Sequence, residues 1–78
     1  MDKKELLARI AAIVTALYET NGSSESMLYI FLDMNMDKWE QVRSILVKAD
    51  LIQIKSHYVT LTENGIKTAK ELNKVISN

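Results

Sequence analysis

The sequence predicts a small, mostly helical domain with one β-hairpin, in the order helix, helix, helix, strand, strand, helix. Apolar residues recur at helical spacing up to about Ala49 and again after Thr62. Between these regions, two short segments alternate apolar and polar residues, which is typical of half-buried strands. With 47% hydrophobic residues, no proline and only two glycines, the chain is neither disordered nor of low complexity.

The length of the chain predicts a single domain that spans residues 1–78. By size scaling, a chain of 78 residues buries about 60–65% of its unfolded surface, which is enough for one small core. The sequence contains no linker and no internal repeat. We therefore expect folding to need neither a metal ion nor a disulfide.

The first helix is predicted to end near Thr20. Asp2 and Glu5 have the spacing of a capping box at its start, and Asn21-Gly22 is typical of a helix stop. Its apolar residues lie on one stripe that should face the core: Leu6, Leu7, Ile10, Ile13, Val14 and Leu17.

The second helix is apolar nearly all round, with Ser23 or Ser24 as its N-cap. Its apolar residues are Met27, Leu28, Ile30, Phe31, Leu32 and Met34. The simpler interpretation places this segment, with Tyr29, in the core of a helix-rich domain. The alternative is an exposed patch for dimerisation.

The third helix should follow the break at 33–36 and run to about Ala49, with Asp37 and Glu40 as a capping box. One face should look inward, with Ile45 beside it: Trp39, Val42, Leu46 and Ala49. Trp39 is expected in the core, although a tryptophan near a helix start can also be an exposed anchor for a partner.

The hairpin is predicted from alternation on both sides of Lys55-Ser56-His57-Tyr58, which must form a tight turn. In the first strand Ile52 and Ile54 alternate with Gln53 and Lys55; in the second, Val59 and Leu61 alternate with Thr60 and Thr62.

The last helix should begin at a cap in which the Thr62 hydroxyl accepts from the amide of Gly65, with Glu63 in the first turn. A glycine here lets another backbone approach closely, so Gly65 is expected to be a packing residue and not part of a ligand site. The helical spacing continues through Ile66, Ala69, Leu72, Val75 and Ile76.

Two segments give the chain a resemblance to a known fold family. Val42-Arg-Ser-Ile-Leu-Val-Lys-Ala-Asp-Leu-Ile52 looks like a recognition helix that leads into a strand, and Tyr58 to Leu72 looks like a leucine-threonine-x-x-glycine entry to a last helix. The chain thus resembles winged helix-turn-helix domains over nearly its whole length, in particular small prokaryotic regulators similar to the MarR and PadR groups. The element order is fairly specific for this fold, whereas the short motifs are degenerate.

The resemblance implies a DNA-binding transcriptional regulator whose third helix enters the major groove and whose hairpin wing touches the backbone or minor groove. Gln41 and Arg43 suit base edges. The expected phosphate-binding residues of the helix are Lys38, Ser44 and Lys48, and the wing offers Lys55, Ser56 and His57.

The charge balance limits this expectation. Ten basic residues equal ten acidic ones, and Asp37 to Leu61 has a net charge of only plus one. Because duplex affinity depends chiefly on phosphate neutralisation, a monomer should bind weakly, and a homodimer that reads two half-sites is expected. The alternative function is a winged helix used as a protein–protein interaction module without DNA binding, favoured by the neutral charge, by Asp37 and Glu40, and by the surplus of apolar residues.

Enzymatic, metal-binding and membrane functions are not expected. The chain has no cysteine, and His57 is its only histidine, so no second histidine or cysteine could bind a metal ion together with it. No cofactor is expected either. It also lacks phosphate-loop, nucleophile-elbow and HExxH motifs. The longest apolar run, Met27 to Leu32, is too short to span a bilayer, and the first residues lack a signal-peptide pattern, so a cytoplasmic location is expected.

Overall fold

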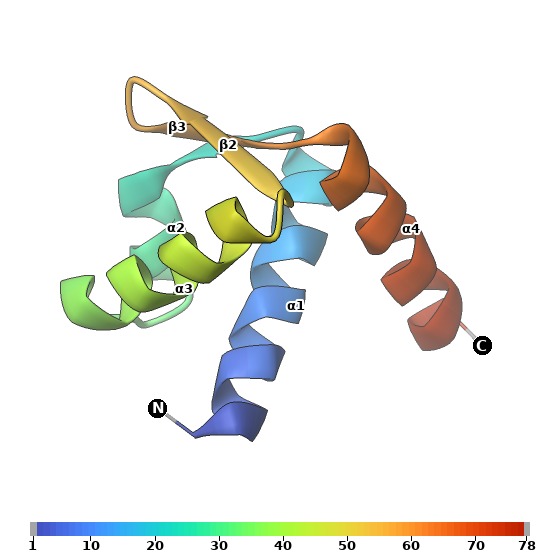
Figure 1. The fold of residues 1–78 in the computed structure, drawn as a ribbon, viewed down its shortest axis with the longest axis horizontal. Helices are drawn as coiled ribbons and strands as arrows, with labels where there is room; N and C mark the ends of the chain where they lie inside the picture. Colours follow the sequence, from blue (N-terminus) through green and yellow to red (C-terminus); the bar gives the residue numbers. More distant parts are fainter. Residues whose placement is uncertain (1, 78) are drawn as a thin grey trace.

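The computed structural model describes residues 2–77, with side chains described for residues 2–75. These residues form four helices and three strands (Figure 1). In order they are α1 (Lys3–Thr20), β1 (Ser23–Ser24), α2 (Glu25–Phe31), α3 (Met36–Lys48), β2 (Ile52–Lys55), β3 (Tyr58–Leu61) and α4 (Glu63–Ser77). The prediction of a mostly helical chain with a hairpin is confirmed.

The strands form one antiparallel sheet in the order β1-β3-β2. The β2–β3 hairpin pairs Ile54 with Val59 and Lys55 with Tyr58, which leaves Ser56 and His57 as a two-residue turn. Both turn residues have positive φ angles, 50° and 64°, as the first and second central positions of a type I′ turn require. The short strand β1 was not predicted, because two serines carry no alternation and only pairing with β3 defines them as a strand.

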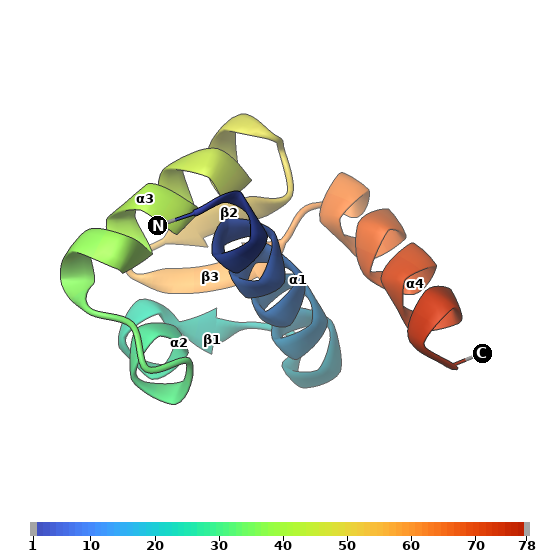
Figure 2. The same cartoon turned by 90° about the horizontal axis from the view of Figure 1, so that it is seen from below.

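The arrangement of the helices separates two sides of the molecule. α4 packs along α1, while α3 and the hairpin extend to the side away from α4 (Figures 1 and 2). Figure 2 shows α1 between these two parts. Among the described helices, none has the length and apolar character needed to cross a membrane.

The core confirms most of the predicted inward faces. Its buried apolar residues are Ile13, Val14, Leu17, Leu28, Met34, Trp39, Val42, Leu46, Ile52, Val59 and Ala69. The assignment of Trp39 to the core is therefore confirmed. The predicted inward orientation is wrong for Leu7 and Ile45, which are exposed at the margins of their helix faces, and for Ala49, which is the exposed C-cap residue after the end of α3.

Three predicted helix caps are confirmed. Asp2 accepts from the amide of Glu5 at 2.7 Å, and Ser24, rather than Ser23, accepts from the amide of Met27 at 3.3 Å. Thr62 accepts from the amide of Gly65 at 3.0 Å. These caps were predictable because each needs only residues that are close in sequence.

The start of α3 differs from the prediction. The N-cap is Asn35, whose side-chain oxygen accepts from the amide of Lys38 at 2.8 Å, so Asp37 lies inside the first turn and is not the cap. The cause is that α2 is shorter than predicted and ends at Phe31. The amide of the buried Met34 donates to Tyr29 at 2.8 Å and fixes the connection, so that α3 begins one residue before Asp37.

The favoured assignment of the segment from Met27 to Met36 to the core is only half right. Leu28 and Met34 are buried, and Tyr29 and Leu32 pack against the core. The assignment is wrong for Met27, Ile30, Phe31 and Met36, which are 60%, 69%, 77% and 55% exposed. With only seven residues, α2 contacts the body of the protein through one side. The other side of α2 therefore faces solvent.

The stripe predicted on α4 is only partly buried. Ala69 lies in the core and Leu72 packs against it, but Ile66 is 39% exposed and Val75 is 77% exposed. The side chain of Ile76 lies outside the described residues.

Candidate nucleic-acid interface

The eight residues predicted to bind DNA come from α3 and the hairpin, which extend to the same side of the molecule (Figure 1). Five of them are exposed and make no side-chain hydrogen bond or ion pair to another residue between 2 and 75: Gln41, Ser44, Lys48, Lys55 and Ser56. The other three, Lys38, Arg43 and His57, each contact a glutamate within the protein.

Arg43 and His57 meet at Glu25, the first residue of α2. A guanidinium nitrogen of Arg43, Nη1, donates to Glu25 Oε1 at 2.8 Å, and His57 Nδ1 lies 2.9 Å from Glu25 Oε2. The backbone joins the same elements, because the amide of Glu25 donates to the carbonyl of His57 at 2.9 Å. One carboxylate therefore ties α2 to α3 and to the hairpin turn.

Glu25 is buried and hydrogen-bonded on both carboxylate oxygens. It is 8% exposed, and Oε1 also accepts from the indole nitrogen of Trp39 at 3.0 Å. Burial by itself raises the pKa of Glu25, but the hydrogen bonds from Arg43, His57 and Trp39, together with the Arg43 charge, outweigh burial and leave the pKa lowered. Glu25 is therefore ionised at neutral pH and compensates the charge of Arg43.

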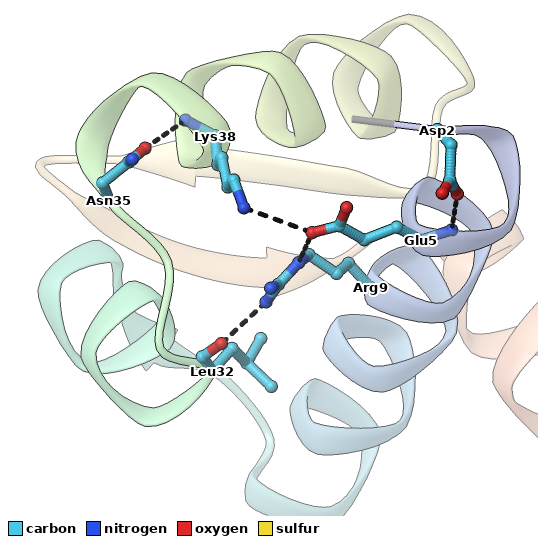
Figure 3. A network of polar contacts seen from close by, with 6 residues as sticks. All are labelled: Asp2, Glu5, Arg9, Leu32, Asn35 and Lys38. Carbon is cyan, nitrogen blue, oxygen red and sulfur yellow. Dashed lines mark hydrogen bonds and ion pairs between the residues drawn. The ribbon is translucent and has the colours of Figure 1, made fainter.

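Lys38 belongs to a different network at the start of α1. Its Nζ donates to Glu5 Oε1 at 3.3 Å, and Arg9 Nε reaches the same oxygen at 3.3 Å (Figure 3). Arg9 also donates to the carbonyl of Leu32 at 2.7 Å, which fixes the end of α2 against α1. The hydrogen bond from Lys38 and the contacts with Arg9 lower the pKa of Glu5, although partial burial opposes them.

The two basic residues Lys38 and Arg43 lie on different sides of α3. Lys38 and Arg43 are five residues apart, which is about 140° around an α-helix. Lys38 faces Glu5 of α1, whereas Arg43 faces Glu25 at the start of α2. The structure thus brings Arg43 and His57 together through Glu25 and leaves Lys38 apart from them.

The solvent-facing surface between Lys38 and Arg43 is polar and partly acidic. A shallow, open hollow on α3 is lined by Asp37, Glu40, Gln41, Ser44 and Ile45. Lys48 follows one turn further along the helix, after Ser44. The amide of Gln41 suits hydrogen bonds to base edges, while phosphate contacts fall to the hydroxyl of Ser44, to Lys48 and to Lys55 of the hairpin.

Glu25 was missed by the sequence reasoning, although one signal could have found it. It is the only charged residue between Glu19 and Asp33, in a segment that is otherwise apolar or neutral. A single acid at the start of a helix is usually explained by the helix dipole. Its burial and its distant partners were not visible in that pattern.

A second cavity of about 240 Å³ lies beside Glu25. It is lined by Ser24, Glu25, Ser26, Tyr29, Met36, Trp39, Arg43 and His57. Within the described part of the chain, no group of three His, Cys, Asp or Glu side chains is placed to hold a metal ion. Glu25 and His57 alone provide too few ligands for one.

Searches against models of protein families, curated proteins and solved structures found no match to this chain. A function for this chain must therefore be inferred from the chemistry and geometry of α2, α3 and the hairpin.

Proposed function

We propose that this protein is a cytoplasmic, DNA-binding transcriptional regulator of the winged-helix type that acts as a homodimer, without catalytic activity. In this proposal α3 enters the major groove and the turn of the hairpin contacts the backbone. The observation that carries it is the placement of α3 and the hairpin on one side of the molecule (Figure 1). On that side Gln41, Ser44, Lys48, Lys55 and Ser56 are exposed and, among the described residues, have no side-chain partner.

The five exposed residues divide into two roles. Gln41 can bond an adenine edge, and Lys48 and Lys55 can neutralise phosphates. The hydroxyls of Ser44 and Ser56 can donate to phosphate oxygens nearby.

In this proposal Arg43 also contacts a base, although it forms an ion pair with Glu25. Its side chain is 37% exposed, and the contact with Glu25 engages only one of the donors of the guanidinium group. Glu25 therefore holds Arg43 in one orientation, which lowers the entropy lost when the remaining donors bind a guanine edge.

The test is an ionic-strength series of binding to duplex DNA, with the oligomeric state fixed by light scattering. With two phosphates neutralised per protomer, by Lys48 and Lys55, a dimer should lose affinity with a log–log salt slope of roughly −4. The absence of duplex binding at the lowest usable salt would overturn the proposal.

Single substitutions should separate base contacts from phosphate contacts. Gln41→Ala is expected to cost about 1–3 kcal/mol of specific binding and to relax base preference at one position. Lys48→Ala and Lys55→Ala should weaken binding to all duplexes similarly and make the salt slope shallower. Fluorescence anisotropy with specific and random duplexes measures both effects.

The matched control is Lys70→Ala, because Lys70 is an exposed lysine on α4, away from α3 and the hairpin. It should leave duplex binding unchanged. If the substitutions at Gln41, Lys48 and Lys55 behave like this control, α3 does not enter the groove.

A second function, a protein-interaction module without DNA binding, is favoured by the acidic hollow on α3. Asp37 and Glu40 lie on the face that would approach DNA, and Ile45 and Val47 are 38% and 49% exposed on the same helix. Such a surface suits a partner that is both basic and apolar. A failure to bind duplex at low salt, combined with capture of a protein partner that Ile45→Glu abolishes, would favour this function.

A further inference from the structure

The exposed side of α2 carries a continuous apolar stripe. Met27, Ile30 and Phe31 follow one another at positions i, i+3 and i+4, which lie together on one helix face. They are 60%, 69% and 77% exposed. We call Met27, Ile30 and Phe31 the α2 patch.

The α2 patch is large for so small a protein. A side chain of this size contributes about 150–250 Å² when fully exposed, so the three exposed fractions amount to roughly 400 Å² of apolar surface. The largest apolar patch of a typical monomer covers about 300–600 Å² and often marks an interaction site. A standard interface buries about 800 Å² per partner, and homodimer interfaces are about 65% apolar, which corresponds to roughly 500 Å², so the α2 patch would supply most of the apolar area.

The charges around the α2 patch favour a second copy of the same chain. Residues 26–32 contain no charged side chain, and the carboxylate of Glu25 is turned inward to Arg43. A twofold contact therefore brings no like charges together at its centre. At the rim, the end of α2 carries both signs, with Arg9 held at the carbonyl of Leu32 and Asp33 exposed beside it.

We propose that the α2 patch is the homodimer interface, with α2 of one copy packed against α2 of the second copy. The inference rests on the proposed function for the need for two copies, and it names the surface that joins them. Gln41, Ser44, Lys48 and the hairpin turn lie outside the α2 patch, so they stay available in the dimer.

The test is light scattering coupled to size exclusion over a concentration series. Phe31→Glu should raise the dimer dissociation constant by at least about thirtyfold, as expected for a central apolar anchor. Val75→Glu is the matched control, because Val75 is also 77% exposed but lies on α4, and it should leave the dimer intact. Circular dichroism should show both variants folded, since neither side chain is in the core.

Ile30→Lys is the second variant, in case Phe31→Glu fails to fold, and it should also give monomers. A wild-type protein that stays monomeric at every concentration, or a Phe31→Glu variant that remains dimeric, would overturn the inference. A monomer that binds duplex with a steep salt slope would contradict the interface but not DNA binding. A dimer lost on Phe31→Glu but unable to bind duplex would contradict DNA binding and support the interface.

Discussion

Gly65→Ala is expected to destabilise the protein by about 3 kcal/mol or more, because the new methyl group would overlap backbone. A Cβ at this position would lie 2.0 Å from the carbonyl oxygen of Leu51 and 3.0 Å from a side-chain carbon of Leu61. The expected result is a lower free energy of unfolding in urea denaturation, because the start of α4 can no longer pack closely against Leu51.

The clash at Gly65 cannot be relieved by a small movement, because the same backbone is held by hydrogen bonds. The amide of Thr62 donates to the Leu51 carbonyl at 3.0 Å. The hydroxyl of Thr62 donates to the Asp50 carbonyl and accepts from the amide of Gly65. A shift of α4 that accommodates a methyl group would therefore break the cap and the connection to β3.

The control is Asn64→Ala, which adds helix propensity at the neighbouring exposed position without meeting Leu51. It should change the free energy of unfolding by less than about 0.5 kcal/mol. If Gly65→Ala is as stable as this control, the close approach of α4 to Leu51 is not a feature of the protein in solution.

Glu25→Ala is expected to lower the free energy of unfolding by about 2–3 kcal/mol, because buried donors lose their acceptor. The indole N–H of Trp39, a residue that is 1% exposed, would be left without its partner, and Arg43 would lose its ion pair. Urea denaturation followed by tryptophan fluorescence measures this loss and also reports the environment of Trp39.

The same carboxylate should make stability depend on pH. The folded-state pKa of Glu25 is lowered, because hydrogen bonds and the Arg43 charge outweigh the effect of burial. A lowered folded-state pKa means a contribution to stability that is present above the unfolded-state pKa and is lost as pH falls through the folded-state value. Glu25→Gln should therefore be less stable than the wild type near neutral pH, and the difference should shrink on acidification.

Glu71→Gln is the control for Glu25→Gln, since it removes the same charge from an exposed position on α4. Its difference from the wild type should stay small across the pH range. A stability difference for Glu25→Gln that is constant with pH would show that the carboxylate charge does not contribute.

Glu25 connects the α3 and hairpin surface, which is proposed to bind DNA, with the α2 patch, which is proposed to form the dimer interface. Its carboxylate faces Arg43 and His57, while Met27, Ile30 and Phe31 lie on the opposite side of the same helix. Because α2 is only seven residues long, a movement of α2 on dimerisation would also move Glu25. Arg43 would then shift with Glu25 through their ion pair. Glu25→Gln should therefore affect duplex affinity more strongly than Glu71→Gln.

The sequence by itself determined the features that depend on neighbours along the chain. The caps at Asp2 and Thr62, a serine cap at position 23 or 24, the tight hairpin turn, the core position of Trp39 and the packing role of Gly65 follow from spacing over a few residues.

Only the tertiary structure decided the features that depend on residues far apart in sequence. Strand β1 exists because its two serines pair with β3, and α2 is exposed because its short length leaves one side uncovered. Glu25 lies 18 residues from Arg43 and 32 residues from His57 in the sequence. Local patterns cannot predict contacts over such separations. The eight predicted DNA-binding residues were named from sequence. Ion pairing, which is a property of the folded chain, divided them into three side chains held by a glutamate and five without a side-chain partner among the described residues.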